Sequence, residues 1–211
     1  MKTLFYQACI TLLLFCQCAS SSIITGAWKA PAVGDTKYKK VFVAALTENV
    51  PARQKVEDEI ANAIQMLGTN TVKSIEVFPP DFNKTGTKKS DLALRRIAET
   101  NSDAILTIAL LDQTSESRYV PNTSIYPVTR FGYYGTFGGY YDFWYGNYND
   151  GYYTTDKTYY LEANLYDVRT NKLIWSTQSE TYNPSSLDSF LKGYKKAIID
   201  QLKKDNVLST N

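Results

Sequence analysis

The chain has 211 residues, 44% of them hydrophobic, and its 23 basic side chains nearly balance 21 acidic ones. No basic stripe stands out, so the sequence carries no electrostatic footprint for binding nucleic acid. Histidine is absent and all three cysteines lie within the first 18 residues; this excludes histidine-based catalysis, zinc sites and iron–sulfur clusters from the body of the chain, and we expect neither a metal nor a cofactor.

The first 17 residues have the pattern of an export signal. Lys2 provides a positive charge, and Leu4 to Phe15 is a largely apolar run, well short of the roughly 20 residues that span a membrane. The run ends in Cys16-Gln17-Cys18 and resembles the signal of bacterial lipoproteins, in which a cysteine is lipidated and becomes the new N-terminus. We predict that residues 1–17 are removed and that Cys18 carries the lipid. Cys16 is the alternative anchor, and secretion without a lipid is the alternative fate.

Residues 18–37 are predicted to form a flexible tether between the lipid and the domain. They are small and polar, with Ser20-Ser21-Ser22 near their start and Pro31 and Gly34 further along. Trp28 is the one large aromatic group in the segment. Its expected place is either the lipid interface or the edge of the domain.

Residues 38–207 are predicted to form one α/β domain, which opens with alternating strands and helices. The expected elements are a strand over 39–46, a helix from about Pro51 to Gly68, a half-buried strand over 72–78, a helix capped by Ser90, and a strand over 104–111. The last strand is the most apolar stretch after the leader. It therefore suits the centre of a sheet.

A hairpin and a helix are expected to complete the domain. Polarity alternates from Thr158 onward, residues 167–172 make a turn, and Leu173 to Glu180 returns as a strand. An apolar stripe at helical spacing predicts a final helix over about 185–202. The predicted fold is α/β, a mixed sheet of about five strands with about three packing helices in the order β-α-β-α-β-(long insertion)-β-β-α.

Several of these stretches resemble a group of bacterial lipoproteins. The matching stretches are Val41 to Leu46, Arg53 to Leu67, Ser102 to Leu106, and Leu165 to Trp175. They are similar to the penicillin-binding-protein activator lipoproteins and to the globular part of the curli-secretion channel protein. The resemblance covers about residues 39–205 without the insertion, and it implies the fold more than the function.

The insertion, residues 113–156, is the least ordinary part of the sequence. Within it, residues 131–153 hold twelve aromatic side chains and six glycines. Loops of this length are usually functional or disordered. We consider a mobile low-complexity loop, a partner-binding surface, a membrane-interface segment and a platform that stacks on sugar rings. The candidate contact residues for a partner are Tyr133, Tyr134, Tyr140, Tyr141, Phe143, Trp144 and Tyr145.

The sequence favours a binding role over catalysis. An enzyme would depend on carboxylates such as Asp112, with Asp142, Asp150 or Asp156, and no spacing in the sequence places two of them at a glycosidase separation. Residues 147–151 suit an ordinary turn better than a calcium loop. We expect a non-enzymatic adaptor that is held to a membrane by its lipid and meets an envelope protein or a glycan. The alternatives are an oligomeric secretion or channel component and a carboxylate-based glycan hydrolase.

The expected location is the bacterial cell envelope. Ala19 and Ser20 follow Cys18, so the sequence has no aspartate retention signal of the enteric type. We therefore expect the outer membrane, with the domain facing the periplasm.

Overall fold

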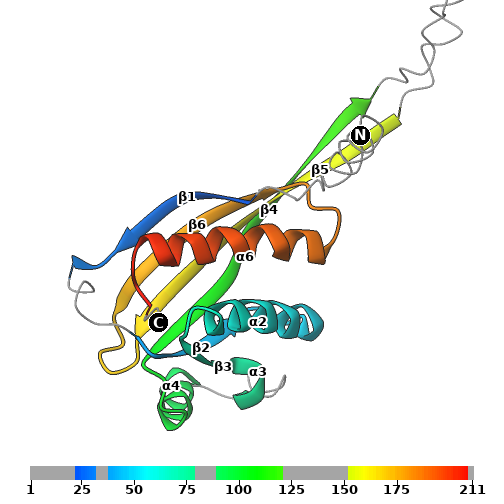
Figure 1. The fold of residues 1–211 in the computed structure, drawn as a ribbon. Coiled ribbons are helices and arrows are strands. Elements are labelled where there is room, and N and C mark those ends of the chain that lie inside the picture. Colours follow the sequence, from blue (N-terminus) through cyan, green and yellow to red (C-terminus); the bar gives the residue numbers. More distant parts are fainter. Residues whose placement is uncertain (1–21, 32–37, 79–88, 121–151, 209–211) are drawn as a thin grey trace, which may run out of the picture. The chain divides into compact units, whose positions relative to one another are not determined.

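The computed structural model describes residues 22–31, 38–78, 89–120 and 152–208 (Figure 1). Contacts divide the chain into two compact units. The main unit comprises Met1–Gln113 and Thr158–Asn211, and the insertion unit comprises Thr114–Lys157. The main unit holds both hydrophobic clusters described below.

A six-stranded mixed sheet forms the centre of the fold and confirms the predicted α/β class. The order across the sheet is β1-β6-β5-β4-β2-β3. Strand β2 runs parallel to β3 and β4, whereas β6 runs antiparallel to both β1 and β5. The strands span Ser22–Lys29 (β1), Lys40–Ala45 (β2), Asn70–Lys73 (β3), Ala104–Val120 (β4), Tyr152–Asp167 (β5) and Leu173–Tyr182 (β6).

Four helices are described, and the ends of the two long ones follow sequence signals. Helix α2, Val50–Gln65, begins after Asn49, whose side chain accepts a hydrogen bond from the Ala52 backbone, and Pro51 occupies the first turn as expected. Gly68, at φ 91°, adopts the left-handed conformation that follows many helices. Helix α6, Leu187–Lys204, begins with a capping box between Ser186 and Ser189. The others are α3, Ser74–Val77, and α4, Lys89–Glu99.

Each face of the sheet has its own hydrophobic cluster. The larger one lies under α2 and α6, where Ile60 and Ile64 of α2 and Tyr194 and Ile198 of α6 pack on the strands around Trp175 (Figure 1). The smaller one lies on the opposite face, where Ala93, Leu94 and Ile97 of α4 pack near Phe42 and Phe78. The rings of Phe42 and Phe78 meet edge to face, with centroids 5.7 Å apart.

Strand β1 is the main difference from the sequence-based expectation. Residues 22–29 lie in the segment expected to be a tether, yet they pair with β6 from Ser22↔Thr181 to Lys29↔Trp175. Ile24 packs against the larger cluster, and the hydroxyls of Ser22 and Thr181 lie 2.6 Å apart. Pairing with β6 gives hydrogen-bond partners to backbone groups that would otherwise be unpaired at the edge of the sheet, and this orders the segment.

Smaller differences concern where elements stop. The expected strand over 72–78 is divided into β3 and α3, because the chain turns at Ser74 into the polar network described below. Ser90 is already helical and so does not cap α4. Strands β4 and β5 continue beyond the expected positions, to Val120 and from Tyr152.

Candidate functional site

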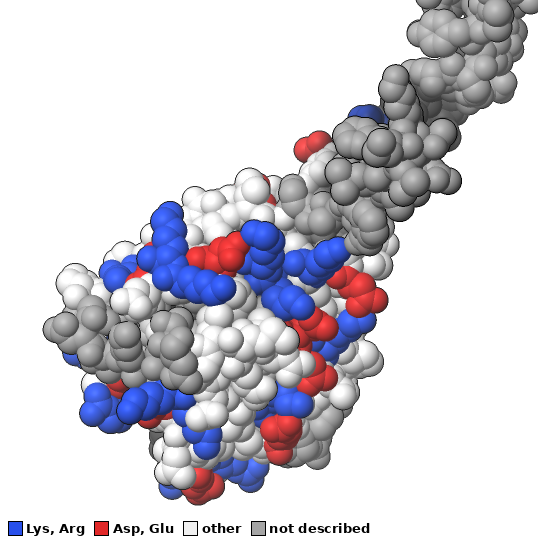
Figure 2. Space-filling view, viewed as in Figure 1, with Lys and Arg blue, Asp and Glu red and all other residues white. Residues whose placement is uncertain are grey.

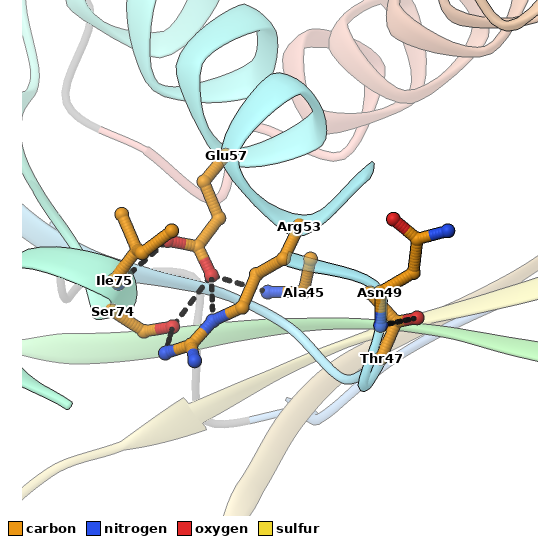
Figure 3. A network of polar contacts seen from close by, with 7 residues as sticks. All are labelled: Ala45, Thr47, Asn49, Arg53, Glu57, Ser74 and Ile75. Carbon is orange, nitrogen blue, oxygen red and sulfur yellow. Dashed lines mark hydrogen bonds and ion pairs between the residues drawn. The ribbon is translucent and has the colours of Figure 1, made fainter. Parts of the chain in front are cut away.

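A buried polar network lies where β2 ends and α2 begins (Figure 3). The side chain of Glu57 is fully buried, and its Oε1 accepts hydrogen bonds from the backbone of Ala45 at 3.0 Å, from Nε of Arg53 at 3.2 Å and from Oγ of Ser74 at 2.5 Å. Its Oε2 accepts from the Ile75 backbone at 2.8 Å. One carboxylate thus joins β2, α2 and α3.

The arrangement suits a structural role. Arg53 is 9% exposed, and its Nη2 donates to Oγ of Ser74 at 2.8 Å, so the guanidinium is bound to the same group of partners (Figure 3). A general acid or base must reach a proton on a substrate. Here donors from the protein occupy both carboxylate oxygens, and burial keeps Glu57 away from solvent.

A second buried pair links the start of the domain to the β5–β6 turn. The hydroxyl of Tyr38 donates to Oδ2 of Asp167 at 3.2 Å, while the backbone and hydroxyl of Thr170 donate to Oδ1 at 2.8 and 3.0 Å. Burial, together with the charge of Asp167, raises the pKa of Tyr38 to about 12. Burial alone would raise the pKa of Asp167, but the bonds from Thr170 and Tyr38 outweigh it and the pKa is lowered.

A third cluster joins β1, β6 and the end of α6. Nε1 of the buried Trp175 donates to Oδ2 of Asp205 at 2.7 Å, and Nε2 of Gln201 donates to the same oxygen at 2.8 Å. Nζ of Lys29, at the end of β1, donates to the backbone carbonyl of Asp205 at 2.8 Å. The sequence did not predict this cluster: Trp175 ends a stretch that carries the family resemblance, but Asp205 lies 30 residues further along and has no local signal that pairs it with the indole.

The residues predicted to contact a lipid or a partner lie outside the described residues. This holds for Cys18 and for the aromatic set Tyr133, Tyr134, Tyr140, Tyr141, Phe143, Trp144 and Tyr145. Both predictions therefore stay predictions.

The carboxylates considered for catalysis are only partly described. Asp112 is exposed on β4 in the main unit. Asp156, in the insertion unit, is 7% exposed and lies 3.3 Å from Nε of Arg118. Asp142 and Asp150 fall outside the described residues. Across the ranges that the structure covers, acidic side chains form no group that could hold a metal ion.

Exposed large apolar side chains gather at the end of the sheet where β1 starts. At this end β2 and β6 finish, and β4 continues past Ile108, where its pairing with β2 stops. Ile23 is directly opposite Glu180 near the end of β6, and the Leu46 backbone bonds to the carbonyl of Ile108 on β4. We call this set the apolar rim: Ile23, Leu46, Leu110, Leu111, Tyr182 and Leu187, between 40% and 60% exposed.

The face formed by α2 and α6 carries charges of both signs (Figure 2). Basic and acidic side chains are interspersed there, and several are paired across the helices, for example Lys195 of α6 with Glu59 of α2 at 2.6 Å. This face has no large field of one sign to attract a polyanion. Among the helices in the described part of the chain, none has the length and apolar character needed to cross a membrane.

Comparison with known proteins finds similar solved structures at low sequence identity. No protein-family model matches the chain, and no curated protein matches it. Among solved structures, a PelC variant dodecamer from Paraburkholderia phytofirmans is similar at 18% identity and TM-score 0.44, covering 91% of this chain and 99% of that chain. Lipoprotein GNA1162 from Neisseria meningitidis is similar at 15% identity and TM-score 0.43, covering 78% and 98%. The predicted resemblance to the penicillin-binding-protein activator lipoproteins and the curli-secretion channel protein stays a prediction.

Proposed function

We propose that this protein is a lipid-anchored component of the bacterial cell envelope whose α/β domain is a non-catalytic binding or adaptor module. The lipid is attached at Cys18, and the domain faces the periplasm from the outer membrane. The observation that carries the proposal is the position of β1. The strand starts at Ser22, only four residues after Cys18, and it is built into the sheet.

A processed chain that begins at Cys18 loses no described part of the fold. Cleavage after residue 17 removes the leader, and Ala19 to Ser21 then connect the lipid to the first strand. Two or three acyl chains, at roughly 0.8 kcal/mol per buried methylene, hold such a protein firmly at a bilayer.

The chemistry of the described polar groups supports binding over catalysis. Glu57 is occupied by four donors from the protein, and Asp167 is bound by Tyr38 and Thr170. The chain has no histidine to act as a base. We propose that contact with an envelope protein or a glycan is made by the aromatic segment 131–153, since tyrosine and tryptophan supply large contact areas at low entropic cost.

An oligomeric secretion or channel component is the second candidate. The observation in its favour is that β1 lies at the edge of the sheet, where one side of its backbone has no strand partner in the described residues. Such an edge can pair with another chain. Light scattering on detergent-extracted protein distinguishes a monomeric adaptor from a closed ring.

Metabolic labelling tests the anchor. Cells that express the wild type, Cys18→Ser or Cys16→Ser are grown with an alkyne palmitate, and the protein is examined for label. We expect the label to be lost with Cys18→Ser and kept with Cys16→Ser. Loss with Cys16→Ser alone would move the anchor by two residues, and an unlabelled wild type would contradict the proposal.

A further inference from the structure

We propose that the apolar rim contacts the lipid bilayer, so that the main unit is oriented with the start of β1 toward the membrane. The inference rests on the proposed lipid at Cys18 and adds a second contact to it. The rim's partner is the membrane surface that holds the lipid, with zwitterionic headgroups of no net charge, rather than a protein.

The connection between the lipidated cysteine and the sheet is short. From Cys18 to Ser22 the chain has four residue steps, which reach at most about 14 Å when fully extended. One headgroup layer of a bilayer takes up roughly 5–7 Å of that reach. Ser22 is fixed in the sheet opposite Thr181. The end of β6 is therefore held within about 10 Å of the membrane surface.

Exposed apolar side chains lie at that end of the sheet. Ile23 follows Ser22, Tyr182 follows Thr181, and Leu187 opens the helix that leaves β6. Their exposed fractions are 56%, 56% and 40%. At a strand spacing of about 4.8 Å, Leu110 and Leu111 extend the rim to β4, about 14 Å from β1, and Leu46 extends it to the end of β2, about 19 Å from β1. Each of these side chains thus keeps about half of its surface exposed, at an end of the sheet that the anchor holds near the membrane.

The charged side chains near the rim form no positive patch. Carboxylates flank the rim, namely Glu48, Asp112, Glu180 and Asp188, and the last of these is paired with Lys55 of α2, so acidic groups outnumber basic ones there. Lys29, Lys203 and Lys204 lie at the other end of the sheet, where β1 and α6 end. That end is about 23 Å from Ser22, since β1 rises about 3.3 Å per residue. The contact is therefore apolar, and acidic lipids should not strengthen it.

Site-specific quenching in vesicles tests the orientation. After the leader is removed and Cys18 is lipidated, the protein has no free thiol, so a single introduced cysteine can be labelled with a fluorescent maleimide. The rim variants are Ile23→Cys and Leu187→Cys. The matched controls are Leu173→Cys and Met66→Cys, also exposed, at the start of β6 and the end of α2. Each mature lipidated protein is reconstituted into phosphatidylcholine vesicles, with and without a lipid that carries a nitroxide quencher on its headgroup.

We expect quenching to be several-fold stronger at positions 23 and 187 than at positions 66 and 173. Replacing a third of the lipid with phosphatidylglycerol should not increase it. Equal quenching at the four positions, or stronger quenching at the controls, overturns the inference. Rim labels that are shielded from the nitroxide only at high protein density would show that a second copy covers the rim, which also overturns it.

Intact-mass analysis of the same samples separates this inference from the proposed function. If Cys18 carries lipid but all four positions are quenched equally, the anchor is supported and the proposed orientation is wrong. Absence of lipid on Cys18 removes the anchor, and with it the length argument on which the orientation depends.

Discussion

The backbone N–H of Ala45 donates to the fully buried carboxylate of Glu57 at a distance of 3.0 Å. Ala45 is the last residue of β2, and Glu57 lies two turns into α2. The bond therefore fixes the angle at which the chain leaves the sheet and enters the helix. Arg53, Ser74 and Ile75 complete the set of donors, and α3 is thereby held to the same point.

Glu57→Ala should destabilise the protein strongly. The change leaves the guanidinium of Arg53 buried without its counter-charge, which typically costs about 3–5 kcal/mol. Urea unfolding gives the free energy. The control is Glu59→Ala, because Glu59 is 41% exposed in its ion pair with Lys195. Exposed pairs contribute about 0–1 kcal/mol, so similar losses in both variants would contradict the structural role of the network.

Ile24→Ala should show that β1 belongs to the folded domain. Ile24 packs against the larger hydrophobic cluster from a strand at the edge of the sheet. Because the side chain is only partly buried, we expect a loss of about 1–2 kcal/mol, at or below the low end of the usual cost of truncating a core isoleucine. Ile23→Ala, one residue earlier and 56% exposed, should change the free energy of unfolding by less than about 0.5 kcal/mol. A flexible tether would give no difference between the two.

Most of the fold could be predicted from the sequence, because its elements carry local signals. Asn49 and Pro51 mark the start of α2, Gly68 follows its end, and the apolar run from Ala104 identifies a central strand. Strand β1 could not be found in this way. Ile23, Ile24 and Trp28 are strand formers, but Gly26 interrupts the run and small polar residues precede it. What shows the segment to be a strand is its pairing with β6, about 150 residues further along the chain.

Tyr194→Phe should leave stability unchanged or increase it. The hydroxyl of Tyr194 is buried, and no hydrogen-bond partner is found for it among the described residues; burial raises its pKa. An unpaired buried polar group costs about 1–3 kcal/mol, so its removal should recover part of that amount in a thermal melt.

Tyr38→Phe is the matched comparison. The same atom is removed there, but it donates to the carboxylate of Asp167. Bonds to charged groups contribute about 1.5–3 kcal/mol, so this variant should be less stable than the wild type. A destabilised Tyr194→Phe would mean that its hydroxyl has a partner.

Asp167→Asn should flatten the acid side of the pH–stability curve. The pKa of Asp167 is lowered in the folded protein. Its contribution is therefore present above the ordinary carboxyl value of about 4 and is lost as the pH falls through the folded-state pKa. Melting temperatures from pH 7 to pH 2 should show the wild type above the variant at neutral pH and the two curves converging in acid. Parallel curves would contradict the assignment.

Asp205→Ala should loosen the junction of β6 and α6. The change removes the acceptor of the buried Trp175 indole and of Gln201, and we expect a loss of about 1.5–3 kcal/mol with a red shift of tryptophan emission. Asp200→Ala is the control, since Asp200 pairs with Lys196 on the exposed face of α6. An equal effect of the two would place the stabilisation in surface charge rather than in the Trp175 contact.

The candidate site was less predictable than the fold. Charged residues such as Arg53 and Glu57 are usually exposed in proteins, yet both are buried here, because α3 and the end of β2 supply hydrogen-bond partners to them. The apolar rim has no sequence signal either. Its members come from β1, β4, β6, α6 and the loop after β2, and only the order and direction of the strands bring these segments to one end of the sheet.

The pairing of β1 with β6 also has a consequence for the order of events during export. A chain that crosses the inner membrane N-terminus first brings out residues 22–29 at the beginning, whereas their partners, residues 173–182, emerge near the end. Ser22 and Thr181 are separated by 159 positions. Under the proposed export, β1 therefore has no partner strand until most of the polypeptide has been translocated, and the lipid-transferring and cleaving enzymes can act at Cys18 before the sheet is complete.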